Sequence, residues 1–143
     1  MGSSSARLTL PAQVESVRMF HRFVRGGAQA AGLEAADMDK LDLVLEEILV
    51  NIARYAYEEG GGEVDVAYST HAGSLLVEVT DRGRSFNPLE AAPPDLALGL
   101  ADRQVGGLGV LLVKQIVGSL SYRRVDGQNK LSFRFPGPHP PST

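Results

Sequence analysis

The chain has 143 residues, the size of one ordinary domain, and its 43% hydrophobic and 22% charged residues can build a core, which excludes a disordered or fibrous protein. Its formal net charge of -3 lacks the basic excess of a protein whose main partner is nucleic acid, and the absence of cysteine excludes disulfides, thiolate metal sites and a cysteine nucleophile. No stretch approaches the roughly 20 consecutive apolar residues that cross a bilayer, so we expect a cytoplasmic protein without membrane contact. We expect flexible ends at residues 1–6 and 136–143 around one domain at residues 7–135.

A strand and an amphipathic helix open the predicted domain. Alternation over residues 7–10 indicates an edge strand, and apolar side chains then recur at three- and four-residue steps over residues 14–24, which is the helical period. The opposite side of this helix carries a basic stripe of Arg18, Arg22 and Arg25. Such a stripe suits a solvated face or, alternatively, a surface that contacts a partner or a second copy of the chain.

The second helix has the clearest pattern in the chain. It begins near Asp37 or Asp39, whose carboxylates suit a helix N-terminus, and its apolar side chains continue along one face to Ala56. Residues 63–69 and 75–80 then alternate between polar and apolar side chains. This alternation predicts two strands of a hairpin.

The last part of the chain combines a long loop, a helix and a second hairpin. Residues 81–107 carry no regular pattern, and a loop this long in a small domain is usually functional. An apolar helix is predicted over residues 110–117, and Asp126-Gly127 is the signal of a type I′ turn between strands at 119–125 and 130–135. The order of elements predicts an α+β fold, a two-layer sandwich with helices on one face of a mainly antiparallel mixed sheet.

Two polar side chains stand at the margin of the second helix. Glu47 and Asn51 are four residues apart and therefore share one face of the helix, where the core meets solvent. An amide oxygen is a ligand for a hard cation such as Mg2+, and a carboxylate can accept a proton from a nucleophile. A pair of this kind is also common on ordinary helix surfaces.

An aspartate ends the third predicted strand. The Asp81 carboxylate could accept a hydrogen bond from an exocyclic amine of a ligand, and Gly83 would let the backbone approach that ligand closely. An ordinary Asp-x-Gly turn is the alternative interpretation.

Glycines surround Leu108 where the apolar helix begins. Gly106, Gly107 and Gly109 leave backbone N–H groups accessible at the positive end of a helix dipole, which is the physical basis of a phosphate cradle. The segment matches neither the Walker A nor the Gly-x-Gly-x-x-Gly pattern.

These three features, in this order and spacing, resemble the N, G1 and G2 boxes of the GHKL superfamily of gyrase, Hsp90, histidine kinase and MutL, which implies its Bergerat ATP-binding fold. The matching runs are residues 45–57, 81–88 and 106–114. Within that superfamily the short chain is most similar to the anti-sigma factor serine-protein kinases of bacterial partner-switching systems.

The resemblance implies a role for each of these residues. Glu47 would be the general base for the attacking hydroxyl, Asn51 would ligate the Mg2+ that bridges the phosphates of ATP, and Asp81 would accept from the adenine amino group. Gly83 and Ser132 would lie near the adenine. Residues of the lid and of the glycine-rich segment would contact the phosphates: Arg103, Gly106, Gly107, Leu108 and Gly109.

The activity that the resemblance implies is that of an ATP-dependent serine/threonine protein kinase. It would phosphorylate a STAS-domain anti-sigma antagonist and sequester a sigma factor, with a homodimer as the expected assembly. Ser85 stands where the G1 box usually has a second glycine and Val50 where the kinases often have threonine. These departures motivate an alternative, a nucleotide-binding anti-sigma or regulatory module without kinase turnover. A histidine kinase is disfavoured because no predicted helical hairpin places a phosphoacceptor histidine.

Overall fold

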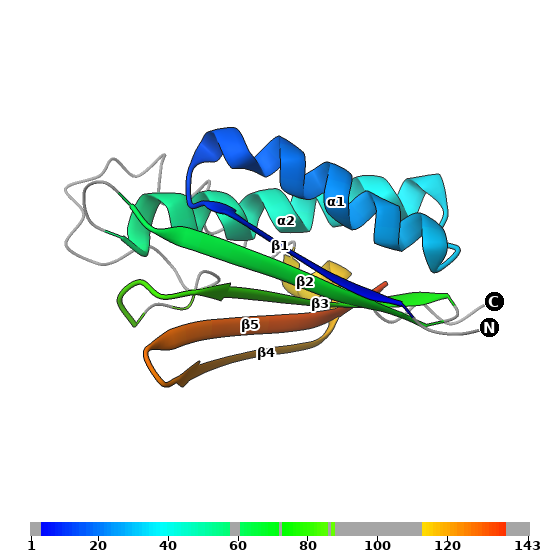
Figure 1. The fold of residues 1–143 in the computed structure, drawn as a ribbon. Helices are drawn as coiled ribbons and strands as arrows, with labels where there is room; N and C mark the ends of the chain where they lie inside the picture. Colours follow the sequence, from blue (N-terminus) through cyan, green and yellow to red (C-terminus); the bar gives the residue numbers. More distant parts are fainter. Residues whose placement is uncertain (1–3, 58–60, 72, 86, 88–112, 137–143) are drawn as a thin grey trace.

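The computed structural model of the protein describes residues 4–57, 61–71, 73–85, 87 and 113–136. The helices and strands are, in chain order, β1 (Ser5–Pro11), η1 (Val14–Ser16), α1 (Val17–Ala30), α2 (Ala35–Tyr55), β2 (Glu63–His71), β3 (Ser74–Asp81), β4 (Gly118–Val125) and β5 (Gln128–Phe135). Residues 113–116 are also helical. The helices α1 and α2 lie side by side over one face of the sheet (Figure 1), which confirms the predicted two-layer α+β fold.

The sheet follows the order β1-β2-β3-β5-β4, and each pair of neighbouring strands among those described is antiparallel. Asp126 and Gly127 have φ angles of 51° and 76°, as the predicted type I′ turn between β4 and β5 requires. The pairing of β3 with β5 joins segments that are distant in the chain and sets Asp81 opposite Asn129.

The core lies between the helices and one face of the sheet. Strand side chains alternate, so every second residue of the central strands points toward α1 and α2. Burying one large apolar side chain contributes about 1.5–3 kcal/mol. Fully buried side chains of both layers include Phe20, Val24, Leu41, Leu45, Ile48, Val66, Leu75, Leu131 and Phe133.

A pair of glycines, Gly26 and Gly27, lies within α1 without interrupting it. One of the two is required by packing. A Cβ atom on Gly27 would overlap the ring of Tyr68 on β2, whereas Gly26 has open space around it. The ring of Tyr68 also stands 5.0 Å from that of Phe23, centroid to centroid. The helix continues to Ala30, and the contact at Gly27 shows that it lies close against β2.

The boundaries differ from the predicted ones in several places. Residues 5 and 6, assigned to a flexible end, belong to β1, and the Ser4 nitrogen donates to Thr70 Oγ1 at 2.9 Å. The second helix begins at Ala35, before either predicted start. Of the predicted loop at residues 81–107, only 81–85 and 87 are described, and the predicted helix at 110–117 is described from residue 113 onward. None of the described helices is long and apolar enough to cross a bilayer.

Candidate active site

Glu47 and Asn51 are brought together on successive turns of α2. The Asn51 Nδ2 atom donates to Glu47 Oε2 at 3.0 Å, which fixes the end of the amide that faces the carboxylate. Burial raises the pKa of Glu47, while the bond from Asn51 and the charge of Arg54 act in the opposite direction. A half-buried carboxylate of this kind accepts a proton more readily than an exposed glutamate does.

Asp81 is a buried carboxylate at the end of β3, with 1% of the residue exposed. Its Oδ1 atom accepts hydrogen bonds from the Gly83 nitrogen at 2.9 Å and from Asn129 Nδ2 at 2.8 Å. Burial raises the pKa of Asp81, and these two bonds together with the charge of Arg124 oppose that rise. Within the described part of the chain, the second oxygen, Oδ2, accepts no hydrogen bond.

The turn after Asp81 packs on the C-terminal end of α2. The Arg84 nitrogen donates to the Ala56 carbonyl at 2.9 Å, and Arg84 Nε donates to the Tyr55 carbonyl at 2.7 Å. A Cβ atom on Gly83 would overlap the Ala56 carbonyl, so this contact requires glycine here. A close approach of Gly83 to a ligand stays a prediction. The contact joins the strand end that carries Asp81 to the helix that carries Asn51.

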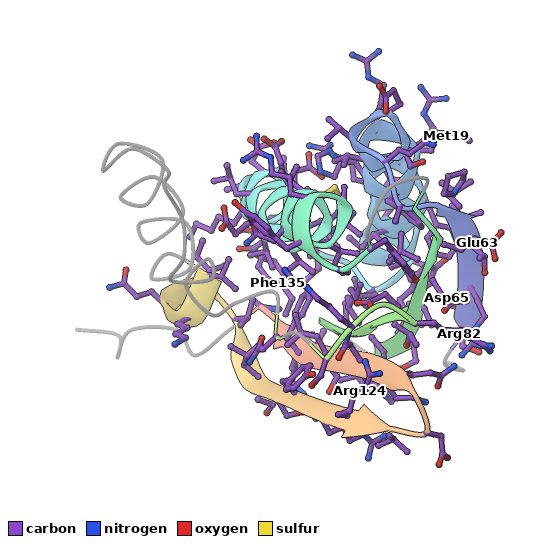
Figure 2. The ribbon with its side chains drawn as sticks, turned by 90° about the vertical axis from the view of Figure 1, so that its left-hand side faces the viewer. Met19, Glu63, Asp65, Arg82, Arg124 and Phe135 are labelled. Atoms are coloured by element: carbon purple, nitrogen blue, oxygen red, sulfur yellow. The ribbon has the colours of Figure 1, made fainter. Side chains whose placement is uncertain are left out.

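Tyr57 makes a second connection at the same end of the domain. Its hydroxyl donates to the Glu63 carbonyl at 2.6 Å and accepts from the Arg82 nitrogen at 2.8 Å. Figure 2 views the molecule from this end and shows Glu63 and Arg82 on neighbouring strand ends. The end of α2, the start of β2 and the end of β3 are therefore held in one arrangement.

A cavity of about 590 Å³ is lined in part by Asp81 but by no other described residue of the predicted site. Most of its polar walls come from side chains on the face of the sheet that the helices leave open: Arg7, Thr9, Asp65, Thr80 and Lys130. Glu47 and Asn51 lie on α2, over the opposite face, and do not line it. The cavity therefore lies mainly on the face of the sheet opposite to α2.

Ser132 lies on the open face of the sheet, whereas Asp81 points to the face that the helices cover, and the predicted place of Ser132 near an adenine stays a prediction. Strand side chains alternate, and in β5 the residues that face the helices include Asn129 and Phe133. The Ser132 hydroxyl instead lies 2.9 Å from the hydroxyl of Ser121. Asn129 is the β5 residue that reaches Asp81, and counting the alternation back from Phe133 could have found it.

The phosphate-binding half of the predicted site lies outside the described residues. That half comprises Arg103, Gly106, Gly107, Leu108 and Gly109, whose roles stay predictions. In the described ranges, no three His, Asp or Glu side chains gather as a metal site. Phosphate oxygens and water would supply further ligands to a Mg2+ ion held by Asn51.

Known proteins match this chain over most of its length. It is 24% identical over 132 residues to the serine-protein kinase RsbW of Bacillus mycoides (strain KBAB4) and 23% identical over 132 residues to that of Bacillus thuringiensis (strain Al Hakam), with 90% of this chain and 82% of each relative covered. A crystal structure of the RsbU and RsbW domains of a Mycobacterium tuberculosis protein superposes with a TM-score of 0.61 at 17% identity. The match covers 94% of this chain but 34% of that one. The family model of the histidine kinase-like ATPase domain matches residues 10–135, and the chain therefore belongs to that family.

Proposed function

We propose that this protein is an ATP-dependent serine/threonine protein kinase of the anti-sigma-factor type. The observation that carries the proposal is the contact between the end of α2 and the turn after β3, through Ala56 and Arg84. This contact joins the helix that bears a base and a metal ligand to the buried carboxylate that suits an adenine. The names of the serine-protein kinase relatives support the same activity.

Asp81 is the proposed adenine-binding residue. Its Oδ1 atom is held by Gly83 and Asn129, which leaves Oδ2 to accept a hydrogen bond from the exocyclic amine of the base. The bonds to Oδ1 favour the ionised carboxylate, and an ionised acceptor binds an amine more strongly than a neutral one.

Glu47 is the proposed general base, and Asn51 the proposed metal ligand. Glu47 accepts the proton of the attacking hydroxyl, a role that suits a carboxylate whose pKa is raised by burial. Asn51 holds Mg2+ through its amide oxygen, because its Nδ2 atom is engaged with Glu47. The bound ion supplies charge neutralisation at the phosphates.

The proposed protein substrate is a hydroxyl on a STAS-domain anti-sigma antagonist, with a sigma factor as the competing partner and a homodimer as the assembly. These partners follow from the resemblance to the anti-sigma kinases. The departures at Val50 and Ser85 support the alternative, a regulatory module that binds nucleotide without turnover. Consumption of ATP in the presence of the antagonist separates the two.

The first test uses the neighbouring carboxylates Glu47 and Glu46, of which Glu46 is exposed. In wild type and in both glutamine variants, Mg-ATP is expected to raise the melting temperature, because it binds only the folded state. Glu47→Gln should lower the rate of phosphoryl transfer to the antagonist by about 100-fold or more, whereas Glu46→Gln, which removes only the smallest of the influences on the pKa of Glu47, should change it far less. Undiminished transfer by Glu47→Gln would disprove the base assignment. ATP that is bound but never consumed by wild type would favour the alternative.

A second variant tests the metal ligand. Asn51→Ala is expected to shrink the magnesium-dependent part of the rise in melting temperature, measured with ATP in the presence of Mg2+ or of a chelator. A full magnesium-dependent rise in this variant would exclude Asn51 as the ligand, and no rise in wild type at millimolar ATP would overturn the kinase proposal.

A further inference from the structure

Asn129 is a buried amide whose two ends are both matched to partners. With 1% of the residue exposed, its Nδ2 atom donates to Asp81 Oδ1 at 2.8 Å and to the Arg84 carbonyl at 2.8 Å. Its Oδ1 atom accepts from the Tyr122 hydroxyl at 2.6 Å and from Arg124 Nη1 at 3.1 Å. Exchanging the two ends would set the amide nitrogen against the Arg124 guanidinium and the amide oxygen against two acceptor oxygens, so the side chain has one favourable orientation.

The donors that hold Asn129 come from β4, the strand at the edge of the sheet. Arg124 Nη1 also donates to the Gly83 carbonyl at 2.7 Å, across 41 positions of the chain. Figure 2 shows Arg124 between the β4–β5 hairpin and the end of β3. Side chains of this hairpin therefore support the Asp81 carboxylate and the turn that follows it.

This support restricts the rotation of the Asp81 carboxylate. Turning the carboxylate would break the bonds that Oδ1 accepts from Gly83 and Asn129, and a buried Asn129 amide left without its partner would be costly. The orientation that keeps both bonds leaves Oδ2 as the atom offered to a ligand.

We infer that Asn129, held by Tyr122 and Arg124, is a positioning residue that orients Asp81 toward the exocyclic amine of a bound purine, so that the β4–β5 hairpin sets the preference for a 6-aminopurine. This inference rests on the proposed function, since it concerns the same nucleotide site. It adds that residues which do not touch the nucleotide decide how well the base is recognised.

The inference separates two parts of nucleotide affinity. Contacts to the phosphates are common to all nucleoside triphosphates, whereas the bond to Asp81 Oδ2 is available only to a base with an exocyclic amine. A hydrogen bond to an ionised group corresponds to about 10- to 100-fold in affinity. Loss of positioning should therefore weaken ATP binding and leave binding of a base without the amine unchanged.

The test compares Mg-ATP with purine riboside 5′-triphosphate, which lacks the 6-amino group, by calorimetric titration of the full chain. Wild type is expected to bind ATP about 10-fold or more tightly than the analogue. Asn129→Leu and Arg124→Met should bring this ratio close to one through weaker ATP binding alone. The matched control is Arg123→Met, because Arg123 is the exposed neighbour of Arg124 and pairs in register with Lys130 instead of Asn129. It should keep the wild-type ratio.

Each other outcome decides the question. An unchanged ratio in Asn129→Leu and Arg124→Met overturns the inference and leaves the kinase proposal standing. Equal weakening of both nucleotides also overturns it, because that result indicates a structural role. If Asn129→Leu does not fold, Arg124→Met and Tyr122→Phe carry the test. Failure of wild type to bind ATP overturns the proposed function and the inference together.

Discussion

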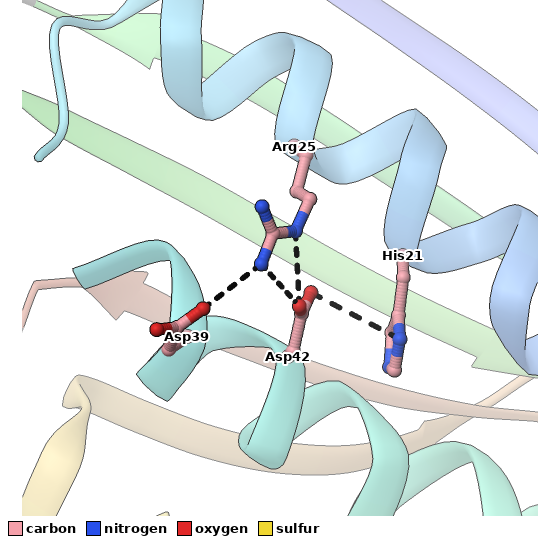
Figure 3. Close-up of polar contacts among 4 residues, drawn as sticks. All are labelled: His21, Arg25, Asp39 and Asp42. Atoms are coloured by element: carbon pink, nitrogen blue, oxygen red, sulfur yellow. Dashed lines mark hydrogen bonds and ion pairs between the residues drawn. The ribbon is translucent and has the colours of Figure 1, made fainter. Parts of the chain in front are cut away.

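Two polar networks hold this domain together, and they differ in how completely their atoms are paired. Between α1 and α2, Arg25 donates to Asp42 Oδ2 from Nε at 2.9 Å and from Nη2 at 2.7 Å, and Nη2 also donates to Asp39 Oδ1 at 3.0 Å (Figure 3). His21 Nδ1 lies 3.9 Å from Asp42 Oδ1, beyond hydrogen-bond distance. Among the described residues, His21 Nε2 and Asp42 Oδ1 are buried and have no hydrogen-bond partner.

In the network around Asn129, the buried amide itself has no such gap. Both ends of its amide are matched, and the Asp81 oxygen left over is the one proposed to meet a ligand. An unpaired buried polar atom costs about 1–3 kcal/mol of stability, so the two unpaired atoms of His21 and Asp42 reduce the net stabilisation that this network gives to the packing of α1 on α2. Because the Asn129 amide is paired at both ends, its network is suited to orient a functional group, whereas the network around Asp42 mainly connects two helices.

The same comparison changes the interpretation of the arginine stripe on α1. Arg25 is engaged with two carboxylates of α2 within the chain, so it belongs to the helix–helix interface. Arg18 instead lines a groove of about 390 Å³ with His21, Glu46 and Val50. The stripe is therefore divided between a structural role and an exposed surface.

Among changes to the two networks, Asp81→Asn has the largest expected effect. The asparagine oxygen can still accept from Gly83 and Asn129, but the group that replaces Oδ2 is a donor and repels the adenine amine. ATP affinity should fall about 10- to 100-fold. The free energy of unfolding at neutral pH should be unchanged or higher, because an ionised group whose pKa is raised by burial is removed. Calorimetry and urea unfolding measure both quantities, and full ATP affinity would exclude Asp81 as the adenine acceptor.

The next effect concerns the network between the helices. Asp42→Ala removes the carboxylate that accepts both Arg25 bonds, so the melting temperature should fall by about 3–6 °C. The matched control is Asp39→Ala, whose side chain is 80% exposed and should cost about 0–2 °C. The ratio of ATP affinity to analogue affinity should be unchanged in both variants. A loss of base preference in Asp42→Ala would show that the two networks are coupled.

The Glu47–Asn51 pair is an intermediate case, a half-buried carboxylate with one bond from Asn51. Its pKa is raised by burial above the ordinary 4.5, so the folded state binds a proton more readily than the unfolded chain, and its contribution to stability is lost as the pH rises through the folded pKa. Glu47→Gln should therefore raise the melting temperature at pH 7, and the gain should vanish below about pH 4. A gain of equal size at both pH values would contradict this origin.

The smallest effect is that of Tyr122→Phe. It removes one donor to Asn129 and leaves the Arg124 bond in place. One hydrogen bond contributes about 0.5–1.5 kcal/mol to stability, so the variant should unfold at a slightly lower urea concentration. The ratio of ATP to analogue affinity should fall less than in Asn129→Leu. A larger fall in Tyr122→Phe would assign the positioning role to the hydroxyl itself.

Local patterns predicted much of the fold and one part of the site. The pairing of Glu47 with Asn51 was predictable because both lie on one helix, where a spacing of four residues determines the neighbours. The turn at Asp126-Gly127 was predictable because few residues adopt positive φ at both positions. Boundaries were less certain, as the start of α2 at Ala35 shows.

The other part of the site depends on strand pairing. Ser132 was predicted to lie near the adenine, whereas the β5 side chain that contacts Asp81 is that of Asn129, three positions earlier and on the opposite face of the sheet. The need for Gly83 was predicted for a ligand, whereas the atom that requires it belongs to Ala56. Asn129 is distant in the chain from Asp81, and Ala56 is distant from Gly83, so no local sequence pattern predicts either contact.

Hydrophobic period and the spacing of residues a few positions apart were enough to predict the α+β class and the pairing of Glu47 with Asn51 on one helix. Three-dimensional packing was needed to show that β5 pairs with β3, that Asn129 donates to Asp81, and that Arg124 donates to Asn129 and to the Gly83 carbonyl. Such contacts join residues 41 and 48 positions apart, and they exist only because core packing selects one strand order and one register.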